Sequence, residues 1–286
     1  MDRRELLLSL PVLGVAAATA ATAAAGEKDL ILVVADPLSS QLSCPCVGGY
    51  AQRDYDKLAA YLTAKLGRPV KAHYSESLAG ALQKKTDGKA DIVVGKDSMV
   101  RADAKAAKMG LQHLACLSGK NGETTQKGLF IVAKDDPALS ADGLKGYKIL
   151  FGPAKADEKH AAALDVLKDL AVPVPSEPET CVSCSVGATK VLELHKKGEK
   201  VATVISNYAL PLLEGCGTVK KGELRIIGET DEVPFIAAFA NDQLSAADRE
   251  SIKTALLEVG KSKDLCTVLE TKAGFVQDPV PAAKKN

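Results

Sequence analysis

Short apolar runs alternate with stretches of helical period along the chain from residue 28 onward. Leu30–Ala35 is an uninterrupted apolar run and predicts a buried strand. After a loop rich in serine, cysteine and glycine, apolar residues recur at helical spacing from Tyr55 to Leu66, and Gly67 is placed to end this helix. Strands that alternate with helices in this way predict an α/β fold.

The same alternation continues to the end of the chain. Further strands are expected at Pro69–His73, Asp91–Gly95, Leu111–Leu117, Gly128–Lys134, Lys148–Phe151, Lys200–Ile205, Leu224–Ile227 and Pro234–Ala240. Further helices are expected at Ser77–Lys85, Arg101–Lys108, Asp157–Leu170, Ser185–Lys197 and Ser245–Val259. A proline-containing loop, Val172–Glu179, separates two of these helices.

The first 25 residues have the pattern of an export signal. Arg3 and Arg4 form a basic start, Leu6–Leu13 is an apolar core, and Ala23–Ala25 is a small-residue cleavage site. The arginine pair is compatible with a twin-arginine (Tat-like) signal as well as with an ordinary Sec signal. We therefore expect residues 1–25 to be removed and the mature protein to be periplasmic. An uncleaved membrane anchor is the alternative.

The composition of the chain disfavours several classes of function. The chain has 37 Lys and Arg against 36 Asp and Glu, a net charge of +1, whereas nucleic-acid binders carry strongly basic surfaces. Aromatic residues make up only 4% of the chain and tryptophan is absent, which disfavours a sugar cleft or a cation cage built on stacked rings. No G-x-S-x-G motif, P-loop or G-x-G-x-x-G is present, so we do not expect an enzyme.

Five segments, in their order and spacing, resemble one known family. They are Asp36-Pro37 after the first strand, Tyr55–Leu62 running into Leu66–Val70, Gly88–Gly95, Leu144–Gly152, and Leu224–Ile227 followed by Val233-Pro234. Together they resemble the phosphonate/phosphate/phosphite-binding proteins of ABC importers, which have the type II periplasmic binding fold. The resemblance covers most of the chain between residues 29 and 260.

This resemblance implies a two-lobed α/β protein in which each lobe is a mixed sheet flanked by helices. Lobe 1 is expected to comprise residues 28–117 plus 216–286, and lobe 2 residues 118–215. A small ligand would lie between the lobes, at strand ends and helix N-termini. Asn207 and Tyr208 fall where the family contacts its ligand. The resemblance also implies an ABC permease as partner and a monomeric protein.

One stretch departs from the family pattern. In the family, a run of hydroxyl residues at residues 152–158 grips the oxyanion, but this chain has no hydroxyl there. Asp157 and Glu158 stand in the expected first helical turn, where they would repel an anion, and Lys155 would offset part of that repulsion. This composition disfavours plain phosphonate binding.

Cysteine is the second departure. Cys44-Pro45-Cys46 follows the first strand, and Cys181-Val182-Ser183-Cys184 precedes Ser185 at a helix start where the family has a ligand loop. If both motifs line the cleft, four thiols form a site for a thiophilic metal, copper or zinc. Structural disulfides and a redox-active dithiol are the alternatives. Cys116, Cys216 and Cys266 are treated as separate from this set.

The sequence thus predicts an exported solute-binding protein with a cleft ligand site. The expected ligand-binding residues are Cys44, Cys46, Cys181, Cys184, Ser185, Lys155, Asn207 and Tyr208. Two other functions keep the same fold: a periplasmic copper or zinc carrier that uses the four thiols, and a thiol–disulfide or electron-transfer accessory protein.

Overall fold

The computed structural model describes residues 28–43 and 52–277. The predicted signal peptide, Cys44 and Cys46 lie outside the described residues. Within the described part, no helix is long and apolar enough to cross a membrane.

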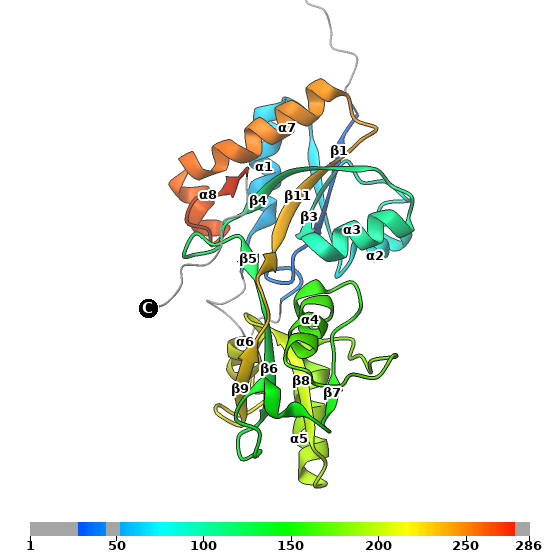
Figure 1. The fold of residues 1–286 in the computed structure, drawn as a ribbon. Coiled ribbons are helices and arrows are strands. Elements are labelled where there is room, and N and C mark those ends of the chain that lie inside the picture. The colour runs from blue at the N-terminus through cyan, green and yellow to red at the C-terminus, as the bar shows by residue number, and fades with distance from the viewer. Residues whose placement is uncertain (1–27, 44–51, 278–286) are drawn as a thin grey trace, which may run out of the picture.

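The larger lobe is built on six strands in the part of the chain that the structure describes (Figure 1). Their order across the sheet is β12 (Phe275–Val276), β4 (Leu111–Leu117), β11 (Ile236–Asn241), β3 (Ile92–Lys96), β1 (Leu30–Ala35) and β2 (Val70–Tyr74). Strand β1 runs parallel to β2 and β3, whereas β11 is antiparallel to β3 and β4. The sheet is therefore mixed, as predicted.

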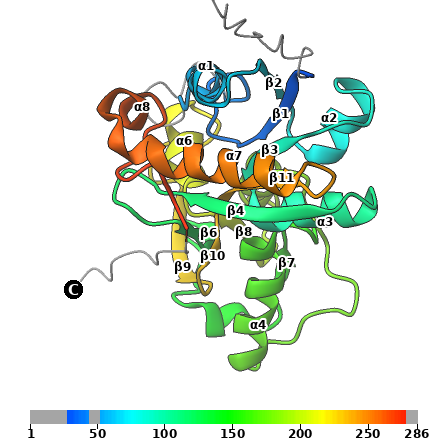
Figure 2. The same cartoon turned by 90° about the horizontal axis from the view of Figure 1, so that it is seen from above.

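Helices cover both faces of this sheet, which explains why its strands are continuous apolar runs. Leu32 and Val34 of β1 pack with α1 (Tyr55–Leu66), α7 (Ala246–Glu258) and α8 (Lys263–Val268). Val33 points to the other face, where it packs with α2 (Leu78–Lys84) and α3 (Asp97–Ala106). Viewed from above, α7 lies across the sheet and α1 beside it (Figure 2).

The smaller lobe contains a four-stranded sheet in the described residues, in the order β7 (Lys148–Leu150), β8 (Val201–Ser206), β6 (Gly128–Ala133) and β9 (Leu224–Glu229). One face packs on α4 (Ala161–Asp169) and the other on α5 (Cys184–Lys196) and α6 (Ala209–Gly215). The sequence-based division put residues 216–286 in lobe 1, but β9 pairs with β6 in the smaller sheet. The chain therefore returns to the larger lobe only after β9.

Two extended segments connect the lobes. Strands β5 (Thr125–Gln126) and β10 (Val233–Pro234) pair antiparallel where the chain passes from β4 to β6 and back from β9 to β11. Figure 1 shows this crossing between the lobes. The short pair is the natural hinge for a relative movement of the two lobes.

The helix predicted at Asp157–Leu170 is broken in the structure. A 3-10 turn, η3 (Asp157–Lys159), is separated from α4 by His160, whose backbone is not helical (φ −130°, ψ −80°). The remaining short elements are η2 (Ala141–Leu144) and η4 (Val259–Lys261).

Candidate functional site

A cavity of about 380 Å³ lies between the two lobes. The larger lobe contributes residues after β1 and at the end of β3, and the smaller lobe contributes η3, the start of α5 and α6. Strand ends and helix starts are the usual location of ligand sites in open α/β sheets. The polar lining includes Lys96, Lys159, Ser183, Cys184, Ser185 and Tyr208, and the apolar lining includes Pro37, Met99, Val182, Leu212 and Leu213.

Glu158 lies beside this cavity, completely buried, at the junction of the lobes. Its carboxylate accepts hydrogen bonds from Lys96 Nζ, from Ser206 Oγ at 2.7 Å and from Gln126 Nε2 at 3.3 Å. Burial opposes its ionisation, but the charges of Lys96 and Lys159 and the hydrogen bonds outweigh burial, so its pKa lies below the ordinary value. Glu158 is therefore an anion inside the protein.

Lys159 is the second buried lysine at the cavity, with only 7% of its surface exposed. Its Nζ donates to Cys184 Sγ at 3.3 Å. Cys184 is the first residue of α5, and the Ser183 hydroxyl caps this helix by accepting from Val186 N. The first backbone N–H groups of a helix lack intrahelical partners and carry a partial positive charge. Lys159 and the start of α5 thus place positive potential at the same end of the cavity.

The cysteines predicted as one site lie in different surroundings. Cys184 lines the cavity, whereas Cys181 is buried in the core of the smaller lobe with Ala188 and Val201. Burial raises the pKa of the Cys181 thiol. Both are free thiols. Cys216, which the sequence analysis set apart, lines the same cavity as Cys184.

The other predicted ligand residues are divided between the cavity and its surroundings. Ser185 and Tyr208 line it, and burial, followed by the neighbouring Cys184, raises the pKa of the Tyr208 hydroxyl. Asn207 instead lines a smaller cavity of about 230 Å³, which Tyr208 also borders. Lys155 points to the larger lobe, where its Nζ lies 2.8 Å from Asp103 Oδ1.

The described residues hold no group of three or more His, Cys, Asp or Glu side chains arranged for a metal. The predicted four-thiol site needs Cys44 and Cys46, which the structure does not describe, and Cys181, which faces the core. The described lining of the cavity offers ammonium groups, hydroxyls and helix N–H groups, together with the exposed carboxylate of Glu76. Its buried charged members, Lys96 and Lys159, are donors that suit an anion.

Sequence reasoning missed Lys96, Lys159 and the burial of Glu158. Lys96 is the last residue of β3, directly after four residues without charge, and a charged residue at the end of a buried strand is the one available signal for it. Lys159 follows two carboxylates and resembles any exposed lysine of a helix start. It lies in a 3-10 turn that a break at His160 separates from α4, and apolar periodicity does not reveal this break.

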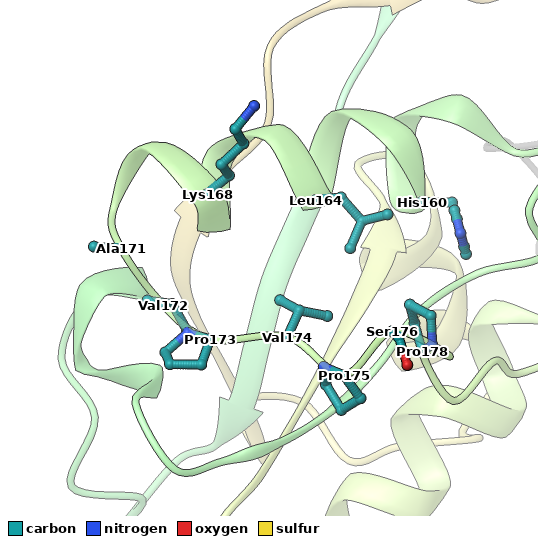
Figure 3. A pocket seen from close by; sticks show the side chains of 10 residues that line it. All are labelled: His160, Leu164, Lys168, Ala171, Val172, Pro173, Val174, Pro175, Ser176 and Pro178. Carbon is teal, nitrogen blue, oxygen red and sulfur yellow. The ribbon is translucent and has the colours of Figure 1, made fainter.

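A larger cavity, of about 640 Å³, lies within the smaller lobe between α4 and the proline-rich loop (Figure 3). Leu164 of α4 and Val174 of the loop lie between the two segments, with His160 at one end. His160 Nδ1 is 2.9 Å from the Gly152 carbonyl oxygen, to which it donates. This cavity involves one lobe only. The interlobe cavity is smaller but combines buried charges with groups from both lobes, so it is the better candidate for a solute site.

The comparisons with known proteins agree with this architecture. A family model described as the periplasmic substrate-binding protein of ABC phosphonate transporters matches residues 50–278. No curated protein matches the chain. Among solved structures, the binding protein component of an ABC phosphonate transporter from Pseudomonas aeruginosa is 16% identical, with a TM-score of 0.63 over 86% of this chain and 80% of that one.

Two further solved structures are similar in fold. PhnD1 of Prochlorococcus marinus in complex with methylphosphonate is 14% identical, with a TM-score of 0.63 over 88% of this chain and 93% of that one. A Xanthomonas citri protein bound to ATP is 17% identical, with a TM-score of 0.62 over 87% of this chain and 90% of that one. These likenesses confirm the predicted two-lobed α/β fold.

Proposed function

Because the chain belongs to the family of periplasmic substrate-binding proteins of ABC phosphonate transporters, we propose that its interlobe cavity binds a small organic anion. The charged group of this solute lies at Lys159 and the start of α5, and its apolar part lies against Pro37, Met99 and Leu212. The observation that carries this proposal is the buried Lys159 ammonium, whose hydrogen-bond partner is a thiol rather than a carboxylate.

Charge balance supports an anionic solute. Lys96 and Lys159 are two buried lysines, and the Glu158 carboxylate is hydrogen-bonded to Lys96. The other acidic side chains nearby are Asp97, which pairs with Arg101, the partly exposed Asp157, and the exposed Glu76 of the cavity lining. Lys159 has no carboxylate as its hydrogen-bond partner in the described residues, since its Nζ donates to Cys184. A buried charge without a counter-charge is costly, and an anion bound beside Lys159 would remove that cost. A head group with a single negative charge, such as a carboxylate, a sulfonate or a phosphonate monoanion, fits this balance.

The walls of the cavity define the rest of the ligand. Side chains from both lobes make them mostly apolar, and a volume of about 380 Å³ is at the small end of the range for ligand pockets. Tyr208 is the one aromatic residue among the described residues that line the cavity. We therefore expect a compact solute with an aliphatic or singly aromatic body.

The family implies a periplasmic location and transfer of the solute to an ABC permease. We extend this to a non-catalytic protein that is exported by the signal at residues 1–25, works as a monomer and has no role in binding nucleic acid. A thiol-based metal site is not part of this proposal, because Cys181 faces the core and the described cavity lining is suited to anions.

The test is anion binding to refolded, ligand-free protein. Methylphosphonate, phenylphosphonate, benzenesulfonate, benzoate and inorganic phosphate would be screened by thermal shift, and the best ligand measured by calorimetry. Lys159→Met should weaken that ligand by about 10- to 100-fold, since it removes a hydrogen bond from a charged donor, whereas Lys159→Arg should keep part of the affinity.

Lys190→Met is the matched control. It removes a partly exposed lysine of α5 whose partner is Glu179 and which does not line the cavity, so binding should change little. Organic anions that leave the melting temperature of the wild-type protein unchanged, or that bind Lys159→Met as tightly as wild type, would contradict the proposed function.

A further inference from the structure

Glu158 has the surroundings of a bound anion rather than those of an ordinary surface carboxylate. Its side chain is completely buried, and its donors Lys96, Ser206 and Gln126 are themselves at most 3% exposed. These donors come from the end of β3, the end of β8 and strand β5. They belong to the larger lobe, the smaller lobe and the connection between them, so one carboxylate joins all three parts.

We propose that Glu158 is a built-in anion: its carboxylate fills an oxyanion site between the lobes and holds them together without a solute. Lys96 Nζ and Ser206 Oγ both donate to the same oxygen, Oε1, while Gln126 Nε2 donates to Oε2. An ammonium, a hydroxyl and an amide that converge on a buried pair of oxygens form a set that also suits phosphate or sulfate. In this protein the Glu158 carboxylate already occupies this set of donors.

The segment that carries Glu158 is fixed to the larger lobe by further contacts. Lys155 Nζ pairs with Asp103, and Ser98 Oγ donates to the Lys155 carbonyl oxygen at 2.9 Å. The Asp157 backbone N–H donates to the same Ser98 hydroxyl at 3.3 Å. These contacts join residues 155–158 of the smaller lobe to α3 of the larger lobe. They explain how Glu158 is held against Lys96.

The consequence is selectivity. An inorganic oxyanion cannot enter the donor set of Glu158 without displacing a covalently attached competitor, so solute is confined to the cavity beside Lys159. This inference rests on the proposed function only in placing solutes between the lobes. It concerns a different set of donors from those at Lys159, and the two are tested by different variants.

The decisive experiment is a gain of binding. Glu158→Ala removes the built-in anion and leaves Lys96, Ser206 and Gln126 facing an empty space. We expect this variant to bind inorganic phosphate at least about tenfold more tightly than wild type by calorimetry, since a charged donor acquires a partner. Phosphate should also raise its melting temperature more than that of wild type. Adding Lys96→Met should abolish the gain, whatever the effect of Lys159→Met on organic anions.

Asp157→Ala is the matched control, because it removes the same charge from the adjacent residue without touching the donor set. It should bind phosphate as wild type does. Equal phosphate affinity in Glu158→Ala, Asp157→Ala and wild type would overturn the proposal.

A second variant covers the case in which Glu158→Ala is poorly folded. Glu158→Gln keeps the size of the side chain but leaves the Lys96 ammonium without its counter-charge. Its radius of gyration, measured by small-angle scattering without solute, should exceed that of wild type and of Asp157→Ala. An unchanged radius would show that the carboxylate does not hold the lobes together.

Discussion

Cys181 and Cys184 are three residues apart, yet their side chains meet different environments. Cys181 packs in the core of the smaller lobe, where burial raises its thiol pKa, whereas Cys184 lines the cavity beside Lys159. Cys216 lines the same cavity, and a hydrogen bond from Thr218 lowers its pKa. The reactive form of a thiol is the thiolate. Neighbours in the sequence are therefore not equivalent nucleophiles.

Site-resolved alkylation checks this difference. In native protein treated with iodoacetamide near neutral pH, Cys184 and Cys216 should be labelled at least about tenfold faster than Cys181. The reason is that the Cys181 thiol is buried and its raised pKa keeps it protonated. Peptide mass spectrometry gives the rate for each cysteine, and labelling in denaturant is the control in which the three rates should converge. Native rates for Cys181 that match those of Cys216 would contradict the burial described above.

The composition of the site was only partly accessible from the sequence. Cleft positions were expected at Cys184, Ser185 and Tyr208, and these residues line the cavity. The sequence places Asp157 and Glu158 together in an expected first helical turn and does not distinguish them. In the structure Asp157 is partly exposed and Glu158 is fully buried, and both lie in a 3-10 turn that the break at His160 separates from α4. A local backbone break leaves no trace in apolar periodicity, so the central residue of the site remained hidden.

At the scale of elements, a buried carboxylate joins the end of β1 to the start of α1. Asp36 Oδ2 accepts from Arg53 Nη1 at 2.9 Å and from the Tyr55 hydroxyl at 2.6 Å. Its other oxygen accepts from Leu38 N at 2.8 Å. Asp36 and Tyr55 are fully buried and Arg53 is 4% exposed. These contacts fix the entry of the first helix relative to the strand that leads into the cleft.

Asp36→Asn should lower the free energy of unfolding by about 3–5 kcal/mol, because Arg53 would remain as a buried charge without its counter-charge. Urea denaturation followed by circular dichroism gives the value. The control Asp56→Asn removes an exposed partner of the Tyr74 hydroxyl and should cost less than about 1 kcal/mol. The double variant Asp36→Asn/Arg53→Met should recover part of the loss, and a double variant as unstable as the sum of the single ones would contradict a coupled pair.

Most elements of this fold could be predicted, because both sheets are covered on both faces and their strands are apolar runs. β1 and α1 have the predicted bounds. α6 was missed, since its seven residues include Pro211 and end at Gly215, which are signals of a loop. The sheet to which β9 belongs was also missed. Its sequence predicts a strand but does not specify a partner, and pairing with β6 depends on where the chain crosses between the lobes.

At the scale of the whole molecule, the closed arrangement depends on one ionised carboxylate, so closure should depend on pH. Glu158 has a lowered pKa in the closed protein, and in an open state it would titrate near its ordinary value of about 4.3. Its contribution to closure is complete above that value and is lost as the pH falls through the lowered pKa. Acid should therefore open the lobes at a pH below about 4.3.

Other charged groups at the junction act differently. Once Glu158 is neutral, the buried ammonium groups of Lys96 and Lys159 lose the nearby carboxylate charge that offsets their mutual repulsion. The pKa of Asp157 is raised, first by burial and then by Glu158 and Asp97, so its protonation at a higher pH relieves repulsion and does not weaken closure.

Small-angle scattering between pH 7 and pH 3 should thus show an increase in the radius of gyration of the wild-type protein only near the acid end of this range. Circular dichroism would establish that the lobes remain folded. Glu158→Gln should be open throughout and show no such step. A wild-type radius that stays constant to pH 3 while the protein remains folded, or the same transition in both proteins, would exclude Glu158 as the group that controls closure.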